Sequence, residues 1–209
     1  MITLYTWTTP NGRKASVMLE EIGADYTVKP VNLGKDEQFD PAFLALSPNN
    51  KIPAIVDPDG QGGERVVFET GAILTYLAEK SRRFLAPSGR RRDEGLEWLF
   101  WSSSSLSPML GQWSYFVLRA PEKVPPAIER FTNEAVRLFG VLEKRLAAEP
   151  YLAGEYSIAD IATFTWVKAV GSKLKEHASD LRETPSIDRW AREIEARPAV
   201  QRGMAVPKV

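Results

Sequence analysis

The chain of 209 residues contains no cysteine and a single histidine. The absence of cysteine excludes disulfide bonds, a cysteine nucleophile and thiolate ligands to a metal. The lone histidine, His177, cannot form a histidine cluster, and it stands in the polar stretch KLKEHASD, which favours a surface position. We therefore expect neither a histidine-based catalytic triad nor a metal centre.

The sequence also lacks a net charge and a long apolar run. Its 27 Lys and Arg residues balance 27 Asp and Glu residues, so no global field draws the chain to nucleic acid or to an anionic membrane. The densest basic run, GRRRDEG at 89–95, turns acidic at once and is interpreted as a solvated linker. No apolar stretch approaches the roughly 20 residues that span a bilayer, and no secretory signal is visible. These features predict a globular, cytoplasmic protein without a membrane or nucleic-acid partner.

Residues 1–82 alternate between strand and helix signals. Short apolar or alternating runs predict strands at 2–7, 25–33, 52–57 and 65–68, and a period of 3.6 predicts helices at 11–23 and 69–81, with a helical turn at 41–48. The order β-α-β-α-β-β-α is typical of a thioredoxin-like mixed sheet with helices packed against it.

Residues 93–209 show helical periodicity and no convincing strand. Helices are predicted at 94–118, 126–149, 157–174 and 186–198, with Pro108 as a kink in the first of them. We therefore predict an α/β plus all-α protein with three parts. These are a thioredoxin-like domain at 1–82, a linker at 83–92 and an all-helical bundle domain at 93–209.

The stretch TTPNG at 8–12 opens the first helix. Thr9 and Pro10 suit the N-cap and the first helical position, but Asn11 and Gly12 are poor helix formers in a first turn. Glycine lets a ligand approach the backbone, and a helix N-terminus attracts an anion or a thiol that is being ionised. This pattern favours a binding site slightly over a turn alone.

Two further stretches suit a small, extended, zwitterionic peptide. The Ile52-Pro53 bond enters a strand either at a sheet edge or through a cis proline, and Ile52 could pair its backbone with an added strand. At the helix start in FETGAIL, Thr70 is interpreted as the N-cap, while Glu69 could take an ammonium group.

The stretch GEYSIADIATF at 154–164 contains Ser157-x-x-Asp160, which approximates a capping box. We interpret this pair as a signal for the start of a helix and not as a pair of catalytic residues.

Taken together along the chain, these stretches resemble the glutathione transferase superfamily, and most closely its Nu-class bacterial disulfide-bond oxidoreductases, which are related to a fungal nitrogen regulator. The resemblance covers nearly the whole chain. It is carried by TPNG at 9–12, GKDEQF at 34–39, SPNNKIPAIVD at 47–57, FETGAILTYLAEK at 68–80, LGQ at 110–112, AIERF at 127–131 and YSIADIA at 156–162.

The resemblance implies glutathione as co-substrate, no metal, and the following site residues. Thr9 and Asn11 would flank the glutathione sulfur as catalytic residues. The implied glutathione-binding residues are Gln38, Asn50, Lys51, Ile52, a cis Pro53, Glu69, Thr70 and, for a second glutathione or the disulfide form, Arg130. The family also implies a homodimer, with the hairpin at 60–69 and the first long helix as interface. Ser102–Ser105 and the QWSYF stretch at 112–116 depart from the family pattern, so the resemblance does not identify the small disulfide or electrophile.

The expected mechanism follows from thiol chemistry. A thiol with a pKa of about 8.5 is mostly protonated at neutral pH, and a helix N-terminus lowers that pKa. The thiolate would then attack a disulfide, with both thiols supplied by glutathione because the chain has no cysteine. Two alternatives stay open: conjugation of glutathione to an electrophile, with Tyr5 as a possible hydroxyl donor, and a glutathione-binding regulatory protein without turnover.

Overall fold

The computed structural model describes residues 1–178, 181 and 183–208. It contains two compact units. The first unit comprises Met1–Pro87 together with the C-terminal segment from Glu195, and the second comprises Ser88–Ile194. In the described part of the chain, no helix combines the length and the apolar character needed to cross a membrane.

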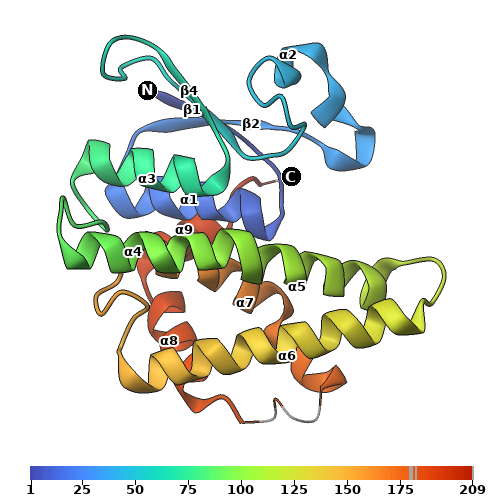
Figure 1. Cartoon of the computed structure of the whole chain (residues 1–209). Helices are drawn as coiled ribbons and strands as arrows, with labels where there is room; N and C mark the ends of the chain where they lie inside the picture. Colours follow the sequence, from blue (N-terminus) through green and yellow to red (C-terminus); the bar gives the residue numbers. More distant parts are fainter. Residues whose placement is uncertain (179–180, 182, 209) are drawn as a thin grey trace. The chain divides into compact units, whose positions relative to one another are not determined.

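The first unit is built on a four-stranded mixed sheet. Its strands are β1 (Ile2–Thr6), β2 (Tyr26–Pro30), β3 (Ala54–Asp57) and β4 (Arg65–Phe68), in the spatial order β2-β1-β3-β4. β1 runs parallel to β2 and antiparallel to β3, and β3 runs antiparallel to β4. Helices α1 (Pro10–Ile22) and α3 (Thr70–Ser81) lie side by side against the sheet, and η1 (Leu33–Lys35), η2 (Glu37–Phe39) and α2 (Pro41–Leu44) connect β2 to β3 (Figure 1). The predicted thioredoxin-like order is confirmed.

Period-2 and period-3.6 patterns explain the packing of β1 and α1. In β1, Ile2 and Leu4 are buried and alternate with half-buried residues, as expected for a strand with one face on the core. In α1, Val17, Met18 and Leu19 are fully buried. The helix ends at Gly23, whose φ of 67° provides the left-handed C-cap that glycine adopts without steric cost.

A final helix, α9 (Pro198–Met204), completes the first unit and was not predicted from the sequence. It packs on α1, where the Ser16 hydroxyl donates to the carbonyl oxygen of Gly203 at 2.7 Å. Arg197 forms two hydrogen bonds with the buried Glu21 carboxylate, at 2.6 and 2.9 Å. The C-terminal segment is therefore tied to α1, while the predicted domain boundaries stay a prediction.

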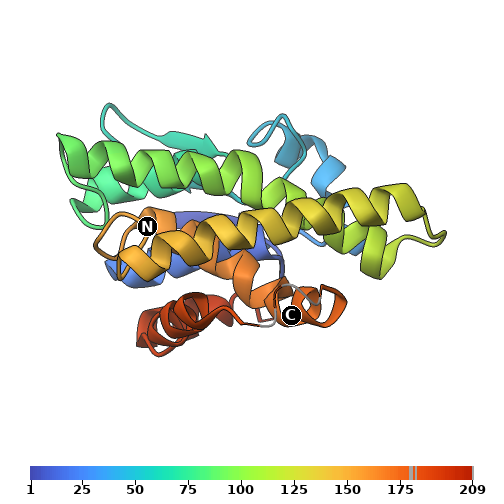
Figure 2. The ribbon, with the colours of Figure 1, turned by 60° about the horizontal axis from the view of Figure 1, so that its bottom comes forward.

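The second unit is all-helical. Its elements are α4 (Arg90–Trp101), the π-helical η3 (Ser102–Leu106), α5 (Ser107–Ser114), the π-helical η4 (Tyr115–Arg119), α6 (Pro125–Ala148), α7 (Ile158–His177) and α8 (Pro185–Glu195). The segments α4, η3 and α5 form one long helical rod that lies alongside α6 in both views (Figure 1, Figure 2). The predicted helical half is confirmed, and α4 already begins at Arg90, inside the stretch interpreted as linker.

The four serines at 102–105 form a π-helical turn inside this rod. The Ser107 N–H donates to the carbonyl oxygen of Ser102, five residues earlier, and Pro108 follows with no N–H of its own. The predicted irregularity near Pro108 therefore takes the form of a widened turn just before the proline.

The predicted capping box at the start of α7 is confirmed. The Asp160 carboxylate is fully buried and accepts the Ser157 N–H at 2.9 Å, the Leu152 N–H at 3.0 Å and the Trp190 indole N–H at 2.9 Å. Burial raises the pKa of Asp160 to about 6, because desolvation outweighs these hydrogen bonds. One carboxylate thus joins α7, the preceding loop and α8.

Candidate functional site

The strand register brings three predicted site segments to one edge of the sheet. Tyr5 of β1 pairs with Ala54 of β3, and Ala54 pairs with Phe68 of β4. The chain leaves β1 toward Thr9, enters β3 from Ile52, and leaves β4 toward Glu69 at this same edge. The α1 start, the Ile52-Pro53 segment and the α3 start therefore lie close together.

The first of these segments is the N-terminus of α1. Thr9 is the N-cap, and its hydroxyl oxygen accepts the Gly12 N–H at 3.0 Å, with Pro10 at the first helical position as predicted. In this hydrogen bond the Thr9 oxygen is the acceptor, so its O–H group can still donate a hydrogen bond to another acceptor. Asn11 is half-buried in the same first turn.

Glycine is required at position 12 for a different reason from the one that the sequence suggested. It is buried, and a Cβ there would lie 2.2 Å from the Trp7 carbonyl oxygen and 2.5 Å from Thr6 Oγ1. The interpretation that this glycine makes room for a ligand is therefore corrected: it makes room for the β1–α1 loop. The anion-attracting helix N-terminus itself remains.

The second segment enters β3. The Ile52-Pro53 peptide bond is cis, which settles the two readings of this proline left open by the sequence. Ile52 is buried in a cluster with Val31, Phe43 and Ala54. No described residue forms a hydrogen bond with the Ile52 backbone outside the strand pairing, so its N–H and C=O suit an added strand.

Gln38, Asn50 and Lys51 lie in the connection between β2 and β3, which begins and ends at the same edge because Thr6 pairs with Pro30. Asn50 has a φ of 50°, and Lys51 is exposed. The Gln38 side-chain oxygen is buried and has no hydrogen-bond partner among the described residues. An acceptor in this state suits a ligand N–H.

The third segment is the start of α3. Glu69, and not Thr70, occupies the N-cap position, so the predicted cap is corrected by one residue. Glu69 has a φ of 70°, a conformation that non-glycine residues rarely adopt. Its carbonyl oxygen accepts the Ile73 N–H at 2.9 Å, while its exposed side chain makes no cap hydrogen bond. Thr70 is the first helical residue.

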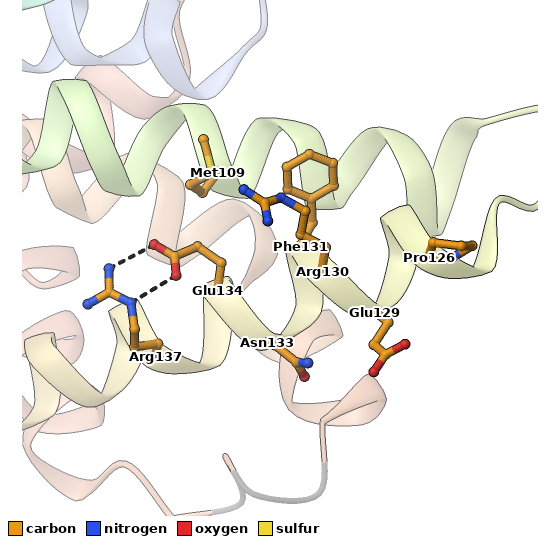
Figure 3. Close-up of a pocket in the computed structure, with 8 residues that line it drawn as sticks. All are labelled: Met109, Pro126, Glu129, Arg130, Phe131, Asn133, Glu134 and Arg137. Atoms are coloured by element: carbon orange, nitrogen blue, oxygen red, sulfur yellow. Dashed lines mark hydrogen bonds and ion pairs between the residues drawn. The ribbon is translucent and has the colours of Figure 1, made fainter.

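Arg130 belongs to the second unit, where it lines a pocket of about 650 Å³ on α6. Figure 3 shows its guanidinium directed toward the α5 side of the pocket, between Met109 and the ring of Phe131. Glu134 and Arg137 form a two-bonded ion pair at 2.8 and 2.7 Å on the same helix. The pocket therefore offers positive, negative and apolar groups together.

Comparison with known families identifies the chain. The model of the glutathione S-transferase N-terminal domain matches residues 1–79, and that of the C-terminal domain matches residues 106–198. The chain belongs to the glutathione S-transferase family. This agrees with the resemblance inferred from the sequence motifs and with the observed fold.

Individual relatives are similar to this chain over nearly their whole length. Disulfide-bond oxidoreductase YfcG of Escherichia coli (strain K12) is 50% identical over 95% of this chain and 92% of its own length. A glutathione transferase family member from Pseudomonas fluorescens pf-5, solved with two glutathione molecules bound, is 43% identical with a TM-score of 0.94 over 99% of this chain and 93% of its own. A Pseudomonas putida glutathione transferase with one glutathione disulfide bound per subunit is 40% identical, with a TM-score of 0.94 over 99% and 91%.

Tyr5 lies in β1. The Tyr5 ring packs on Phe43 with ring centroids 6.3 Å apart, and the Tyr5 hydroxyl oxygen accepts a hydrogen bond from the Lys29 ammonium at 3.3 Å. The sequence left Tyr5 open as a hydroxyl donor to sulfur. These contacts place the Tyr5 ring against the cluster of Val31, Phe43, Ile52 and Ala54.

Sequence reasoning missed Lys14, which lies on α1 two residues after Gly12. Its side chain is 1% exposed, and burial lowers its pKa to about 7, while the Glu69 carboxylate acts in the opposite direction. In the sequence, a lysine among the apolar residues of a helix does not indicate that its side chain is buried. Among the described residues, no group of three or more His, Cys, Asp or Glu side chains could hold a metal ion.

Proposed function

We propose that this glutathione S-transferase family member is a glutathione-dependent disulfide-bond reductase that activates glutathione at the N-terminus of α1 without a protein cysteine. The observation that carries the proposal is the Thr9 hydroxyl, which caps α1 and keeps its own proton for a sulfur acceptor. The similarity to disulfide-bond oxidoreductase YfcG and to structures holding two glutathione molecules or glutathione disulfide supports it.

Thr9 and Asn11 act on the sulfur in this proposal. A thiolate at a helix N-terminus is stabilised by the partial positive charge of the first-turn N–H groups. The Thr9 hydroxyl adds a charge-assisted hydrogen bond, and the half-buried Asn11 stands beside it in the first turn. Together they lower the pKa of the glutathione thiol toward neutrality.

The reaction then consumes two glutathione molecules. The first thiolate attacks one sulfur of a small disulfide, forms a mixed disulfide and expels a thiolate, which takes up a proton. The second glutathione thiolate attacks the glutathione sulfur of that mixed disulfide and expels the other half of the substrate. The products are two small thiols and glutathione disulfide, and the chain contributes no sulfur because it has no cysteine.

The remaining predicted residues hold the peptide. Ile52 pairs its backbone with the cysteinyl unit, the cis Pro53 fixes that backbone, and Glu69 and Thr70 bind the γ-glutamyl end. At the glycine end, the proposed contacts are Gln38, Asn50 and Lys51. Arg130 takes a carboxylate of the second glutathione or of the disulfide form.

We further propose Nu-class membership, a cytoplasmic location and a homodimer. The cytosol keeps glutathione and other thiols reduced, as this reaction requires. Exposed apolar side chains on β4 and α4 support an interface, namely Val66, Phe68 and Phe100, the last of which is 65% exposed.

Glutathione-dependent reduction of a small model disulfide, coupled to glutathione reductase, tests the proposal with wild type, Asn11→Ala and Tyr5→Phe. We expect wild type to turn over, Asn11→Ala to lose about tenfold or more in kcat/KM, and Tyr5→Phe to keep its activity. Loss of activity in Tyr5→Phe with an active Asn11→Ala would favour conjugation through a tyrosine hydroxyl. Wild type that binds glutathione by calorimetry but reduces no disulfide and conjugates no electrophile would favour a regulatory protein.

A further inference from the structure

Two opposite charges lie next to each other in the pocket on α6. Arg130 and Glu134 both line the pocket and are four residues apart, a spacing that places Cβ atoms about 5–6 Å apart on one face of a helix. In the part of the chain that the structure describes, however, the Arg130 side chain forms no ion pair and no hydrogen bond. Its N–H donors are therefore available to a ligand.

The Glu134 carboxylate is held in place by Arg137 instead. Arg137 Nε and Nη2 donate to the two Glu134 carboxylate oxygens at 2.8 and 2.7 Å, and Figure 3 shows this two-bonded pair. These hydrogen bonds keep the pKa of Glu134 below its usual range, so the group is an anion at neutral pH. Each carboxylate oxygen has two lone pairs, so both oxygens can accept a further hydrogen bond from a ligand.

Apolar side chains complete the surroundings of Arg130. Its guanidinium lies between Met109 of α5 and the ring of Phe131 (Figure 3). The Phe131 ring stacks on Phe116 of η4, with ring centroids 5.4 Å apart and ring planes inclined by 13°, so this wall of the pocket is fixed. The pocket volume of about 650 Å³ suits a small molecule, since such sites measure roughly 300–1,000 Å³. A ligand with a charged end and a short apolar stem fits these walls.

An α-amino acid group is a ligand end that needs both charges. Its carboxylate and its ammonium are attached to the same carbon atom, so it requires a cationic donor and an anionic acceptor side by side. We propose that the pocket on α6 recognises a free α-amino acid group, with the carboxylate bound by Arg130 and the ammonium bound by Glu134. Glu134 is then a specificity-determining residue, which favours reactants with a free ammonium group over reactants without one.

The inference rests on the proposed function, because the reactants of disulfide reduction are the molecules that carry such a group. One source is the second glutathione, whose γ-glutamyl end has a free ammonium and a free carboxylate on one carbon atom. The other source is a small disulfide built from amino acids, such as cystine. The two sources share the chemistry that Arg130 and Glu134 recognise, and kinetics distinguish them.

Three disulfides test the inference in the assay coupled to glutathione reductase. Cystine carries both the ammonium and the carboxylate, N,N′-diacetylcystine lacks the ammonium, and 2-hydroxyethyl disulfide lacks both groups. The variant is Glu134→Gln, which removes the negative charge but keeps an oxygen that accepts from Arg137. Its Tm should therefore stay close to that of wild type.

The pattern across the disulfides identifies the source of the recognised group. If the disulfide carries it, Glu134→Gln should lose about tenfold in kcat/KM for cystine and keep wild-type values for the other two disulfides. If the second glutathione carries it, the KM for glutathione should rise about tenfold with all three disulfides. A residue of merely structural importance would produce neither pattern.

Glu193→Gln is the matched control. It removes a carboxylate that also pairs with an arginine, Arg189 at 3.3 Å, but lies on α8 and outside the pocket. It should change neither kcat/KM for any of the disulfides nor the KM for glutathione.

Wild-type kinetics in Glu134→Gln, or an equal loss of kcat/KM for all three disulfides with an unchanged KM for glutathione, overturns the role of Glu134 and leaves the proposed function standing. Wild-type protein that reduces none of the three disulfides overturns the proposed function and this inference with it.

Discussion

The Thr9 hydroxyl oxygen accepts the backbone N–H of Gly12 at 3.0 Å. One side chain therefore begins α1 and, in the proposed reaction, donates a hydrogen bond from its O–H group to the glutathione sulfur. The two roles differ in chemistry, because a cap needs an oxygen acceptor whereas sulfur activation needs an O–H donor.

Substitutions at Thr9 separate the two roles. Thr9→Ser keeps both, so stability and disulfide reduction should match wild type. Thr9→Asp keeps an acceptor for the cap but places a negative charge beside the thiolate, so kcat/KM should fall about tenfold or more with little change in Tm. Thr9→Ala should lose activity and about 1 kcal/mol of stability. An active Thr9→Asp would show that Thr9 only caps the helix.

Gly12→Ala should destabilise the protein although alanine favours helices. The added Cβ would lie 2.2 Å from the Trp7 carbonyl oxygen, so the β1–α1 loop must shift, at a cost of about 2 kcal/mol. Urea unfolding measures the change. Gly140→Ala on α6 is the control, because a Cβ there meets nothing within 4 Å and should stabilise by about 0.5–1 kcal/mol. Equal stability of the two variants would contradict the steric explanation.

Asp160→Ala should be strongly destabilising. It removes the acceptor of the Leu152, Ser157 and Trp190 N–H groups in a fully buried place, and each buried donor left unpaired costs about 1–3 kcal/mol. Ser157→Ala, which removes a single cap, should cost only about 1 kcal/mol. Comparable losses in the two variants, measured by urea unfolding, would argue against the joining role of the carboxylate.

The pH dependence of stability should report the raised pKa of Asp160. The folded state holds the proton up to a pKa of about 6, whereas the unfolded state releases it near the ordinary aspartate pKa of 3.8. The contribution of this proton to the free energy of unfolding is therefore complete below about pH 4, and it is lost as the pH rises through about 6. The stability advantage of wild type over Asp160→Asn should shrink between these pH values. An advantage that grows with pH would show that the carboxylate is ionised in the fold.

Arg130→Ala should weaken glutathione-dependent disulfide reduction. The loss of a charge-assisted contact to a carboxylate predicts a fall of about tenfold in kcat/KM for glutathione. Arg119→Ala is the control, because it removes an exposed arginine from η4, outside the pocket, and should leave kcat/KM unchanged. Equal effects of the two substitutions would assign the loss to general charge and not to the pocket.

Sedimentation should give a mass about twice that of the 23.4 kDa chain if the proposed homodimer forms. Phe100→Glu should shift the protein toward monomer, since it places a charge on an exposed apolar side chain of α4. A wild-type particle of chain mass would remove the homodimer from the proposal.

Most of the fold was predictable because local signals agreed with the tertiary structure. The alternation in β1, Pro10 at the start of α1 and the Ser157 capping box each appear in the structure where the sequence places them. α9 was missed because seven residues carry too little periodicity, and it owes its place to packing on α1.

The candidate site was harder to predict where its cause lies in three dimensions. The sequence indicated TTPNG as unusual but could not show that Gly12 faces the Trp7 carbonyl group. It likewise placed the α3 cap on Thr70, because a positive φ at Glu69 has no signature in residue type. The deep burial of Lys14, which lowers its pKa to about 7, depends on packing that no local pattern encodes.

The close packing of α9 on α1 has a consequence for the order in which the chain folds during its synthesis. At Gly203 even a methyl group would come within 2.5 Å of the Val17 backbone, so the two helices meet with no space to spare. Domains generally fold in order as they leave the ribosome. Here the first unit comprises both Met1–Pro87 and the segment from Glu195, so α1 completes its packing only after the intervening Ser88–Ile194 has been synthesised.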